Sequence, residues 1–133
     1  MFLKESAPTE QIKQMNPVVL AFVGDAVYSL FIRERLAKNV DKKSGVLSEM
    51  AAHEVNASSQ AKKADILAEF FTEEETAIFL RARNAKKPTH AKHSSIAEYN
   101  KSTGYEAVLG YLYLSGQIER LDQILNFGET DER

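Results

Sequence analysis

Two acidic residues lie in stretches that are otherwise apolar, and they are the residues whose types point most directly to chemistry. Asp25 follows Gly24 inside VVLAFVGDAVYSLFI (residues 18–32), and Glu106 opens EAVLGYLYL (residues 106–114). A carboxylate buried among apolar side chains is costly unless it is paired or bound to a metal. If the two stretches pack against each other, their carboxylates form the kind of hard oxygen site that Mg²⁺ or Mn²⁺ prefers.

Each acid also has an ordinary interpretation. Asp25 could cap another helix or pair with a buried arginine. Glu106 ends the sequence Thr103-Gly104-Tyr105-Glu106, which fits a capping box in which the glutamate bonds back to the Thr103 amide. Two glycines favour the metal interpretation. Gly24 breaks a helix interior at a cost of about 1 kcal/mol relative to alanine, and Gly110, one turn after Glu106, permits two helices to approach closely.

A basic segment, RARNAKKPTHAKH (residues 81–93), is the third feature. It contains no acid, although the whole chain has a formal net charge of −2, so it forms a local positive patch suited to phosphate contacts. A solvated basic loop would have the same composition. His90 and His93 have no neighbours that would complete a zinc site. The candidate RNA-binding residues are Arg81, Arg83, Asn84, Lys86, Lys87 and Lys92, with Lys62 and Lys63 as a weaker extension.

The elements that must position these residues are predicted to be helices. Asn16 as cap and Pro17 at the first helical position open a helix over residues 18–36, and its almost uniformly apolar sequence predicts a central, buried element. Thr72 and Glu75 form a capping box for a helix that runs to about Arg83. The other expected elements are two helices within residues 46–71 with a break near Ser58 and Ser59, a short helix over 94–100, a helix from Thr103 to about 115, and a last helix over 118–127. No segment shows strand alternation, so the predicted fold is all-α.

Length and composition limit the possible number of domains and the possible classes of site. A chain of 133 residues fits one domain, here a core of about residues 16–127 with a polar tail at 128–133. The absence of cysteine excludes disulfides and thiolate zinc sites. No signal peptide is recognisable at the N-terminus, and no apolar run approaches the ~20 residues that cross a bilayer. We therefore expect a cytoplasmic protein without a membrane partner.

The motifs match a known family. FVGDAVYSLFIR (residues 22–33) resembles the signature helix of ribonuclease III, and STGYEAVLGYLYL (residues 102–114) resembles the second catalytic helix of that family. RARNAK (residues 81–86) and VNASSQA (residues 55–61) resemble its short branch, Mini-ribonuclease III, which consists of the nuclease domain alone. The four matches occur in the family's order along nearly the whole chain.

The resemblance implies a ribonuclease III endonuclease fold, a homodimer, and Mg²⁺-dependent hydrolysis of double-stranded RNA that leaves a 5′-phosphate and a 3′-hydroxyl. For the short branch, it implies precursor 23S ribosomal RNA as the substrate. Asp25 corresponds to the signature aspartate and Glu106 to the essential glutamate, which makes them the expected catalytic residues. Phe22 matches the aromatic position that inserts across the family's dimer interface. Without a separate RNA-binding domain, the nuclease domain must hold its own substrate, which favours a role for the basic segment.

The acidic set is smaller than in typical ribonuclease III. Ala21 and Val18 occupy positions where the family carries glutamates, and Thr103 occupies that of an aspartate. These departures motivate a second hypothesis, a non-catalytic RNA- or ribosome-binding helical protein with a degenerate nuclease site. A third hypothesis is a helical protein-interaction domain with no role in RNA.

Overall fold

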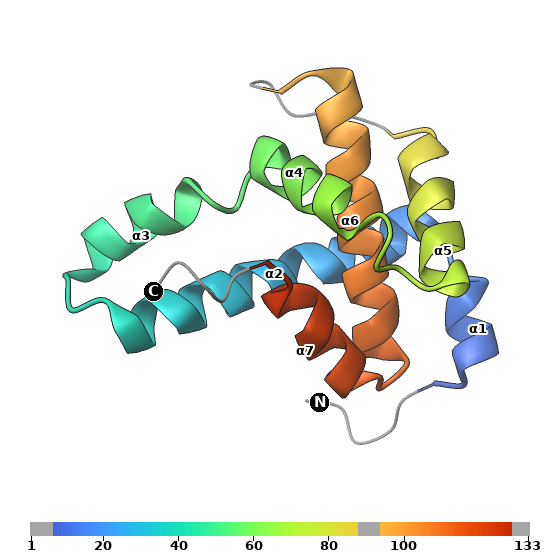
Figure 1. The fold of residues 1–133 in the computed structure, drawn as a ribbon, viewed down its shortest axis with the longest axis horizontal. Helices are drawn as coiled ribbons and strands as arrows, with labels where there is room; N and C mark the ends of the chain where they lie inside the picture. The colour runs from blue at the N-terminus through green and yellow to red at the C-terminus, as the bar shows by residue number, and fades with distance from the viewer. Residues whose placement is uncertain (1–6, 88–93, 129–133) are drawn as a thin grey trace.

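The computed structural model describes residues 7–87 and 94–128, and in these residues the chain is helical without strands, which confirms the predicted all-α fold (Figure 1). Lys92 and both histidines of the basic segment lie outside the described residues. The helices are α1 (Thr9–Lys13), α2 (Pro17–Asn39), α3 (Ser44–Ala52), α4 (Ala57–Leu67), α5 (Glu73–Asn84), α6 (Ile96–Leu114) and α7 (Ile118–Asn126). None of these helices is long and apolar enough to cross a membrane.

Helix α2 begins as the sequence predicts. The Asn16 side chain accepts a hydrogen bond from the Val18 amide at 2.8 Å, and Pro17 is the first helical residue. One face of α2 is in the core, where Leu20 and Tyr28 are fully buried. The opposite face is open: the exposed fraction is 78% for Phe22. The expectation that α2 is buried on nearly every side is therefore wrong for this face, because no described element packs over it.

Helix α6 is longer than predicted and continuous. Ser95 caps it, with Glu98 completing a capping box three residues later. Thr103 lies inside the helix, where its hydroxyl donates to the Tyr99 carbonyl at 3.0 Å. The predicted short helix and the predicted start at Thr103 are both wrong, and so is the capping-box interpretation of Glu106.

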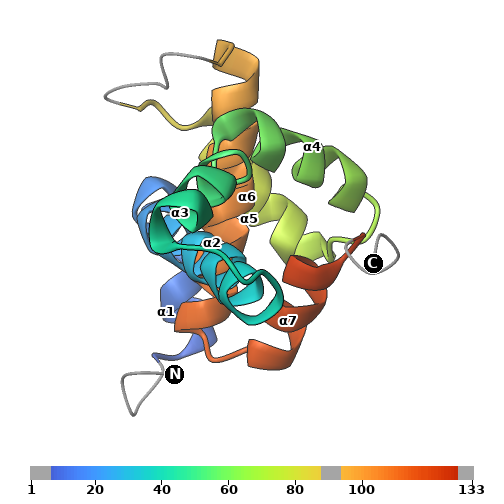
Figure 2. The same ribbon diagram turned by 90° about the vertical axis from the view of Figure 1, so that its left-hand side faces the viewer.

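Helices α2 and α6 cross at the centre of the molecule (Figures 1 and 2), with two glycines at the crossing. A Cβ atom on Gly24 would lie 1.7 Å from the Glu106 carbonyl oxygen, and one on Gly110 would lie 1.9 Å from the Leu20 carbonyl oxygen. Real Cβ atoms do not approach backbone so closely, so the crossing requires glycine at both positions. The close approach predicted from Gly110 is confirmed.

The remaining helices surround this crossing. Helices α4 and α5 pack mainly on α6, while α3 lies along the C-terminal part of α2 at one end of the molecule (Figure 1). The break between α3 and α4 falls at residues 53–56, before the predicted position, because Asn56 caps α4 and leaves Ser58 and Ser59 in its first turn. The Thr72–Glu75 capping box of α5 is confirmed.

Candidate active site

The α2–α6 crossing brings Asp25 and Glu106 together. Asp25 is exposed on α2 and Glu106 is half-buried on α6, and a hydrogen bond joins their carboxyl groups. Two carboxyl groups can share a hydrogen bond only if one of them carries a proton, because ionised carboxylates have acceptors alone. The pairing of the two acids predicted from the sequence is therefore present, because the Asp25 carboxyl group lies close enough to Glu106 to raise its pKa.

The environment explains where that proton resides. Burial and then the neighbouring Asp25 carboxyl raise the pKa of Glu106 to about 9, while a hydrogen bond from Gln60 acts in the opposite direction. Both raising effects disfavour a second negative charge in this position. A site of this kind favours any external cation that can replace the proton.

Gln60 is a site residue that the sequence alone did not predict. It lies on α4 with only 3% of its surface exposed, and its Nε2 atom donates to Glu106 Oε2 at 3.2 Å. The segment VNASSQA, which contains it, is informative only as a family resemblance. No spacing rule could have linked Gln60 to Glu106, because the contact depends on how α4 packs against α6.

A cavity of about 370 Å³ opens over the acid pair. It is formed by α2, the start of α4, the N-terminal half of α6, and Lys87 from the segment after α5. Its lining residues are Val18, Ala21, Phe22, Asp25, Val55, Asn56, Ala57, Gln60, Lys87, Tyr99, Ser102, Thr103 and Glu106. Among the described residues, no group of three or more His, Asp or Glu side chains is placed to hold a metal ion.

Comparison with known proteins identifies the fold. A family model described as the Ribonuclease III domain matches residues 18–117, which include both acids and most of the cavity. The chain belongs to the ribonuclease III family. Proteins named Mini-ribonuclease 3 from Enterococcus faecalis and Staphylococcus aureus are each 42% identical to it, over 91% and 86% of this chain and 97% and 87% of their own. A crystal structure of a Fusobacterium nucleatum protein aligns with a TM-score of 0.79 at 29% identity, covering 87% of this chain and 93% of that one.

These findings confirm the family and the short branch inferred from the motifs, and they support an RNA endonuclease. The structure also places the departures from the typical ribonuclease III pattern. Val18, Ala21 and Thr103, the positions where the family commonly carries further acids, all line the cavity that contains Asp25 and Glu106. The departures noted from the resemblance therefore lie on one cavity wall, which has apolar or neutral side chains at these positions.

Of the described residues of the basic segment, Lys87 lines the cavity and the others lie outside it. Lys87 lines it, with Nζ donating to the carbonyls of Arg83 at 3.0 Å and Ala85 at 2.7 Å, and burial lowers the pKa of Lys87. The Arg83 side chain donates to Asn84 Oδ1 at 3.1 Å, and Lys86 is exposed.

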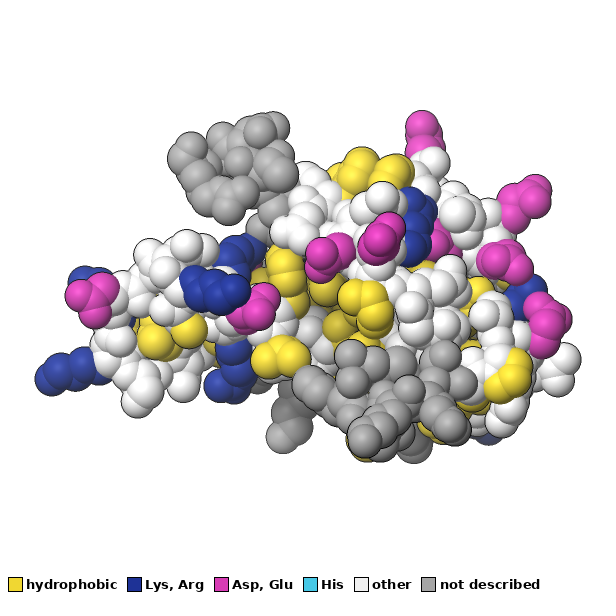
Figure 3. All heavy atoms as spheres, turned by 90° about the horizontal axis from the view of Figure 1, so that it is seen from below, with side chains coloured by type: hydrophobic (Ala, Val, Ile, Leu, Met, Phe, Trp, Pro, Cys, Tyr) yellow, Lys and Arg dark blue, Asp and Glu magenta, His cyan; other side chains and the backbone are white. Residues whose placement is uncertain are grey.

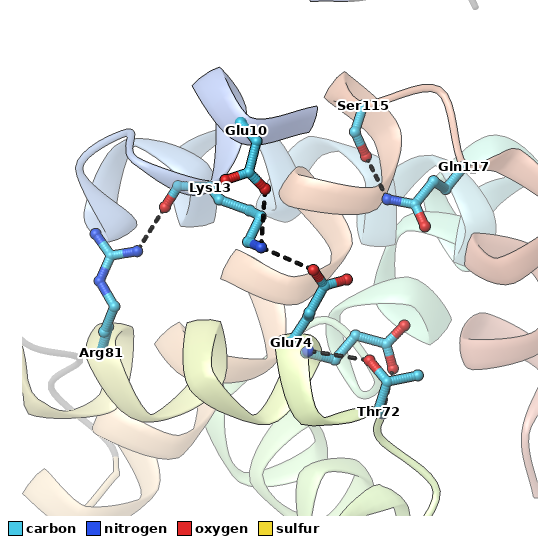
Figure 4. A network of polar contacts seen from close by, with 8 residues as sticks. Glu10, Lys13, Thr72, Glu74, Arg81, Ser115 and Gln117 are labelled. Carbon is cyan, nitrogen blue, oxygen red and sulfur yellow. Dashed lines mark hydrogen bonds and ion pairs between the residues drawn. The ribbon is translucent and has the colours of Figure 1, made fainter. Parts of the chain in front are cut away.

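Arg81 connects two helices. Its guanidinium donates to the Lys13 carbonyl at 2.6 Å and to the Met15 carbonyl at 3.2 Å, which ties α5 to the end of α1 (Figure 4). On α4, Lys62 is exposed, whereas Lys63 lies over the rings of Tyr28 and Phe31 with Nζ 5.6 and 5.8 Å from their centres.

Phe22 lies where two hollows meet. It borders the acid cavity and also an apolar groove of about 640 Å³ between α2 and α7. The groove continues past Leu30, which is 55% exposed, to Ile118, which is 42% exposed. The face drawn in Figure 3 shows hydrophobic side chains between the charged ones, with basic and acidic side chains toward both ends of the molecule.

Proposed function

We propose that this protein is a cytoplasmic, metal-dependent endoribonuclease that hydrolyses double-stranded RNA, with Asp25 and Glu106 as its metal-binding catalytic residues. The observation that carries the proposal is the pair of neighbouring carboxyl groups that line one cavity, Asp25 from α2 and Glu106 from α6. Family membership supplies the reaction class.

The residues present fit a divalent cation such as Mg²⁺ or Mn²⁺. Two carboxyl groups and nearby neutral oxygens are hard ligands, and Mg²⁺ in particular is often held by one or two carboxylates while it keeps several waters. When bound, the cation would activate a water molecule for attack and stabilise negative charge on the phosphate. With only two acids, the site leaves room for RNA phosphate oxygens beside them.

The chain's own residues then have separate roles. Asp25 and Glu106 would hold the cation as two carboxylates, and Glu106 would release its proton to solvent when the cation binds. The attacking water would lose a proton to solvent and form a bond to phosphorus, while the bond to the 3′-oxygen breaks and that oxygen takes up a proton from solvent, which leaves a 5′-phosphate and a 3′-hydroxyl. Lys87, the only basic residue among the described cavity lining, is placed to neutralise a phosphate there.

The grip on RNA is proposed to extend from Lys87 along the surrounding basic residues. Arg83, Asn84 and Lys86 lie at or just beyond the end of α5, and Lys62 and Lys63 lie on α4. Arg81 contributes less, because its guanidinium is turned toward the end of α1 and does not line the cavity. A-form RNA is recognised mainly through its shape, phosphates and 2′-hydroxyls, so this surface should tolerate many sequences. The resemblance to Mini-ribonuclease III implies that precursor 23S ribosomal RNA is the natural substrate.

A second copy of the chain is proposed to cover the apolar face of α2. Phe22, 78% exposed beside the groove, is the side chain that such a copy would bury. A symmetric pair places the same surface on both partners. Because Phe22 also borders the acid cavity, the pair would bring two cavities close enough to act on opposite strands of one duplex.

The test is cleavage of a long, end-labelled RNA duplex by wild type and Asp25→Asn, with Mg²⁺, with Mn²⁺ and with chelator. The matched control is Asp41→Asn, since Asp41 is exposed in the connection between α2 and α3 and borders neither hollow. We expect metal-dependent cleavage by wild type and Asp41→Asn, and its loss in Asp25→Asn. Undiminished cleavage by Asp25→Asn would show the catalytic assignment to be wrong. A wild type that binds the duplex without cutting it would instead favour the non-catalytic RNA-binding protein.

A further inference from the structure

The Gln60 side chain is a buried amide that faces a catalytic carboxyl group. Gln60, Ser102 and Thr103 are the buried polar residues of the cavity wall, and of these Gln60 is the one that donates to Glu106. Ser102 and Thr103 instead donate to the Tyr99 carbonyl within their own helix. A buried amide without a partner is costly, so a side chain chosen for packing alone would be apolar.

Helix α4 holds Gln60 firmly in place. Asn56 accepts from the Ser59 amide at 2.9 Å, and its own amide donates to the carbonyls of Ala52 at 3.1 Å and His53 at 2.9 Å. These bonds fix the first turn of α4, directly before Gln60. The amide therefore reaches Glu106 from an anchored helix, and flexible loop residues have no part in the contact.

The Glu106 carboxyl group is held from two sides by two different helices. Asp25 approaches it from α2, and Gln60 approaches it from α4. A carboxyl group can rotate about its last bond, and the Gln60 bond to one oxygen limits this rotation. Gln60 donates to Oε2, so Oε1 remains available as a ligand for an ion that Asp25 also binds.

We propose that Gln60 is a positioning residue, which orients the Glu106 carboxylate so that it and Asp25 bind one divalent cation together. The inference rests on the proposed function, because it takes the acid pair as the cation site. The Gln60 amide is neutral, which suits this role. It donates a hydrogen bond without supplying a positive charge that would compete with the cation. Partners that hydrogen-bond to metal ligands commonly change metal affinity or activity by about 10–100-fold when they are removed.

The test compares wild type with Gln60→Met, a residue of similar length that lacks the amide. Mn²⁺ binding is measured by calorimetry, and duplex cleavage is measured over a range of Mn²⁺ concentrations. We expect Mn²⁺ affinity to fall about tenfold or more. Half-maximal cleavage should move to a correspondingly higher Mn²⁺ concentration, with most of the rate recovered at saturation. The matched control is Gln117→Met, whose amide donates to Ser115 Oγ at 2.8 Å at the far end of α6 (Figure 4) and should leave Mn²⁺ affinity unchanged.

The outcomes separate this inference from the function on which it rests. Unchanged Mn²⁺ affinity in Gln60→Met, with cleavage reduced equally at every Mn²⁺ concentration, would assign Gln60 a merely structural role and overturn the inference. If Gln60→Met fails to fold, Gln60→Asn serves instead, because its amide ends one methylene short of Glu106. A wild type that binds Mn²⁺ but cuts no RNA would refute the nuclease and leave the role of Gln60 in binding intact. A wild type that binds no Mn²⁺ would overturn both.

Discussion

Two glutamates in this molecule are withdrawn from water, and their surroundings differ in one decisive respect. Glu75, 3% exposed at the start of α5, bonds through both oxygens to Arg120 on α7 at 2.8 Å. Arg120 also donates to the Phe70 carbonyl at 2.7 Å and lies over the Phe70 ring. Glu106 meets a second acid and a neutral amide, and within the described part of the chain its hydrogen-bond partners include no basic side chain.

The two glutamates differ in the charge of their partners, and this charge indicates whether a buried carboxylate has a structural or a chemical role. At Glu75 the counter-charge is part of the chain, so the pair is complete once the protein folds and it serves to join α5, α7 and the turn between α4 and α5. At Glu106 the nearest titratable group adds negative charge, so the arrangement is complete only with a proton or an external cation. Both acids are withdrawn from water, so burial alone does not distinguish them. The basic partner of Glu75 indicates a structural role, whereas the acidic and neutral partners of Glu106 suit the binding of a cation.

The largest effects are expected when each glutamate is replaced by glutamine. Glu106→Gln should cleave duplex RNA at least about a hundredfold more slowly, the scale on which loss of one preorganised charged group acts. Its thermal unfolding in chelator should not fall below that of wild type, because an amide keeps the volume and removes the need for a proton.

Glu75→Gln should show the reverse behaviour. Arg120 would remain largely buried without its anion, which costs about 3 kcal/mol of unfolding free energy, while cleavage below the unfolding temperature should be retained. Both quantities are measured for both variants, by calorimetric unfolding and by initial cleavage rates. If Glu106→Gln lost stability while Glu75→Gln lost activity, the division between the two sites would be wrong.

Enlarging the helix crossing should disturb the acid pair without changing either acid. Gly24→Ala places a methyl group against the Glu106 carbonyl, so α2 and α6 must separate, with a loss of about 2 kcal/mol in unfolding free energy from overpacking. We also expect weaker Mn²⁺ binding, because the two carboxyl groups move apart. The control is Gly45→Ala in α3, where a methyl group would meet nothing within 4 Å. Equal stability of the two variants, measured by urea unfolding, would contradict the close contact.

A pH dependence specific to the acid pair is also expected. In metal-free protein the pKa of Glu106 is raised from 4.5 to about 9. Between these pH values the folded protein therefore holds one more proton here than the unfolded chain. The unfolding free energy should thus fall as pH rises through this window, by at most about 1.4 kcal/mol per pH unit.

Urea unfolding in chelator at pH 6 and pH 8 measures this effect as the difference between wild type and Glu106→Gln. The difference should shrink when Mn²⁺ is added, since the cation takes the place of the proton. Parallel pH profiles for the two proteins would show that Glu106 is ionised in the folded state without a metal.

Local signals in the sequence are enough to predict several elements. The Asn16–Pro17 start of α2 and the Thr72–Glu75 capping box depend on contacts within one turn, so they could be predicted from neighbouring residues. The pairing of Asp25 with Glu106 could also be predicted, because each interrupts an apolar stretch and both stretches carry a glycine suited to close packing.

The sequence does not predict features for which two local signals compete or for which packing between distant helices determines the result. Ser95–Glu98 and Thr103–Glu106 have the same capping-box pattern, and only the first is used, because Thr103 bonds within the helix. Gly104, next to it, has the low helix propensity of a breaker, yet its lack of a side chain is what lets α6 approach the Phe79 ring. The open face of α2 could not be predicted, because an apolar helix sequence does not show whether the residues packed on it belong to the same chain or to another one. The roles of Gln60 and Arg81 both depend on helices far away in the sequence.

The glycine crossing also determines when the site becomes ordered. Since the backbone of α2 touches the backbone of α6 at Gly24 and Gly110, main-chain contact in the core sets the distance between the backbones of the two acids, and only their side chains remain to be oriented. The entropy lost in bringing the acids together therefore belongs to folding, and an arriving ion would meet a ready-made geometry. Hydrogen exchange at the crossing should accordingly be as slow in the metal-free protein as in the rest of the core, so the proposed catalytic site would be among the last parts of the molecule to open.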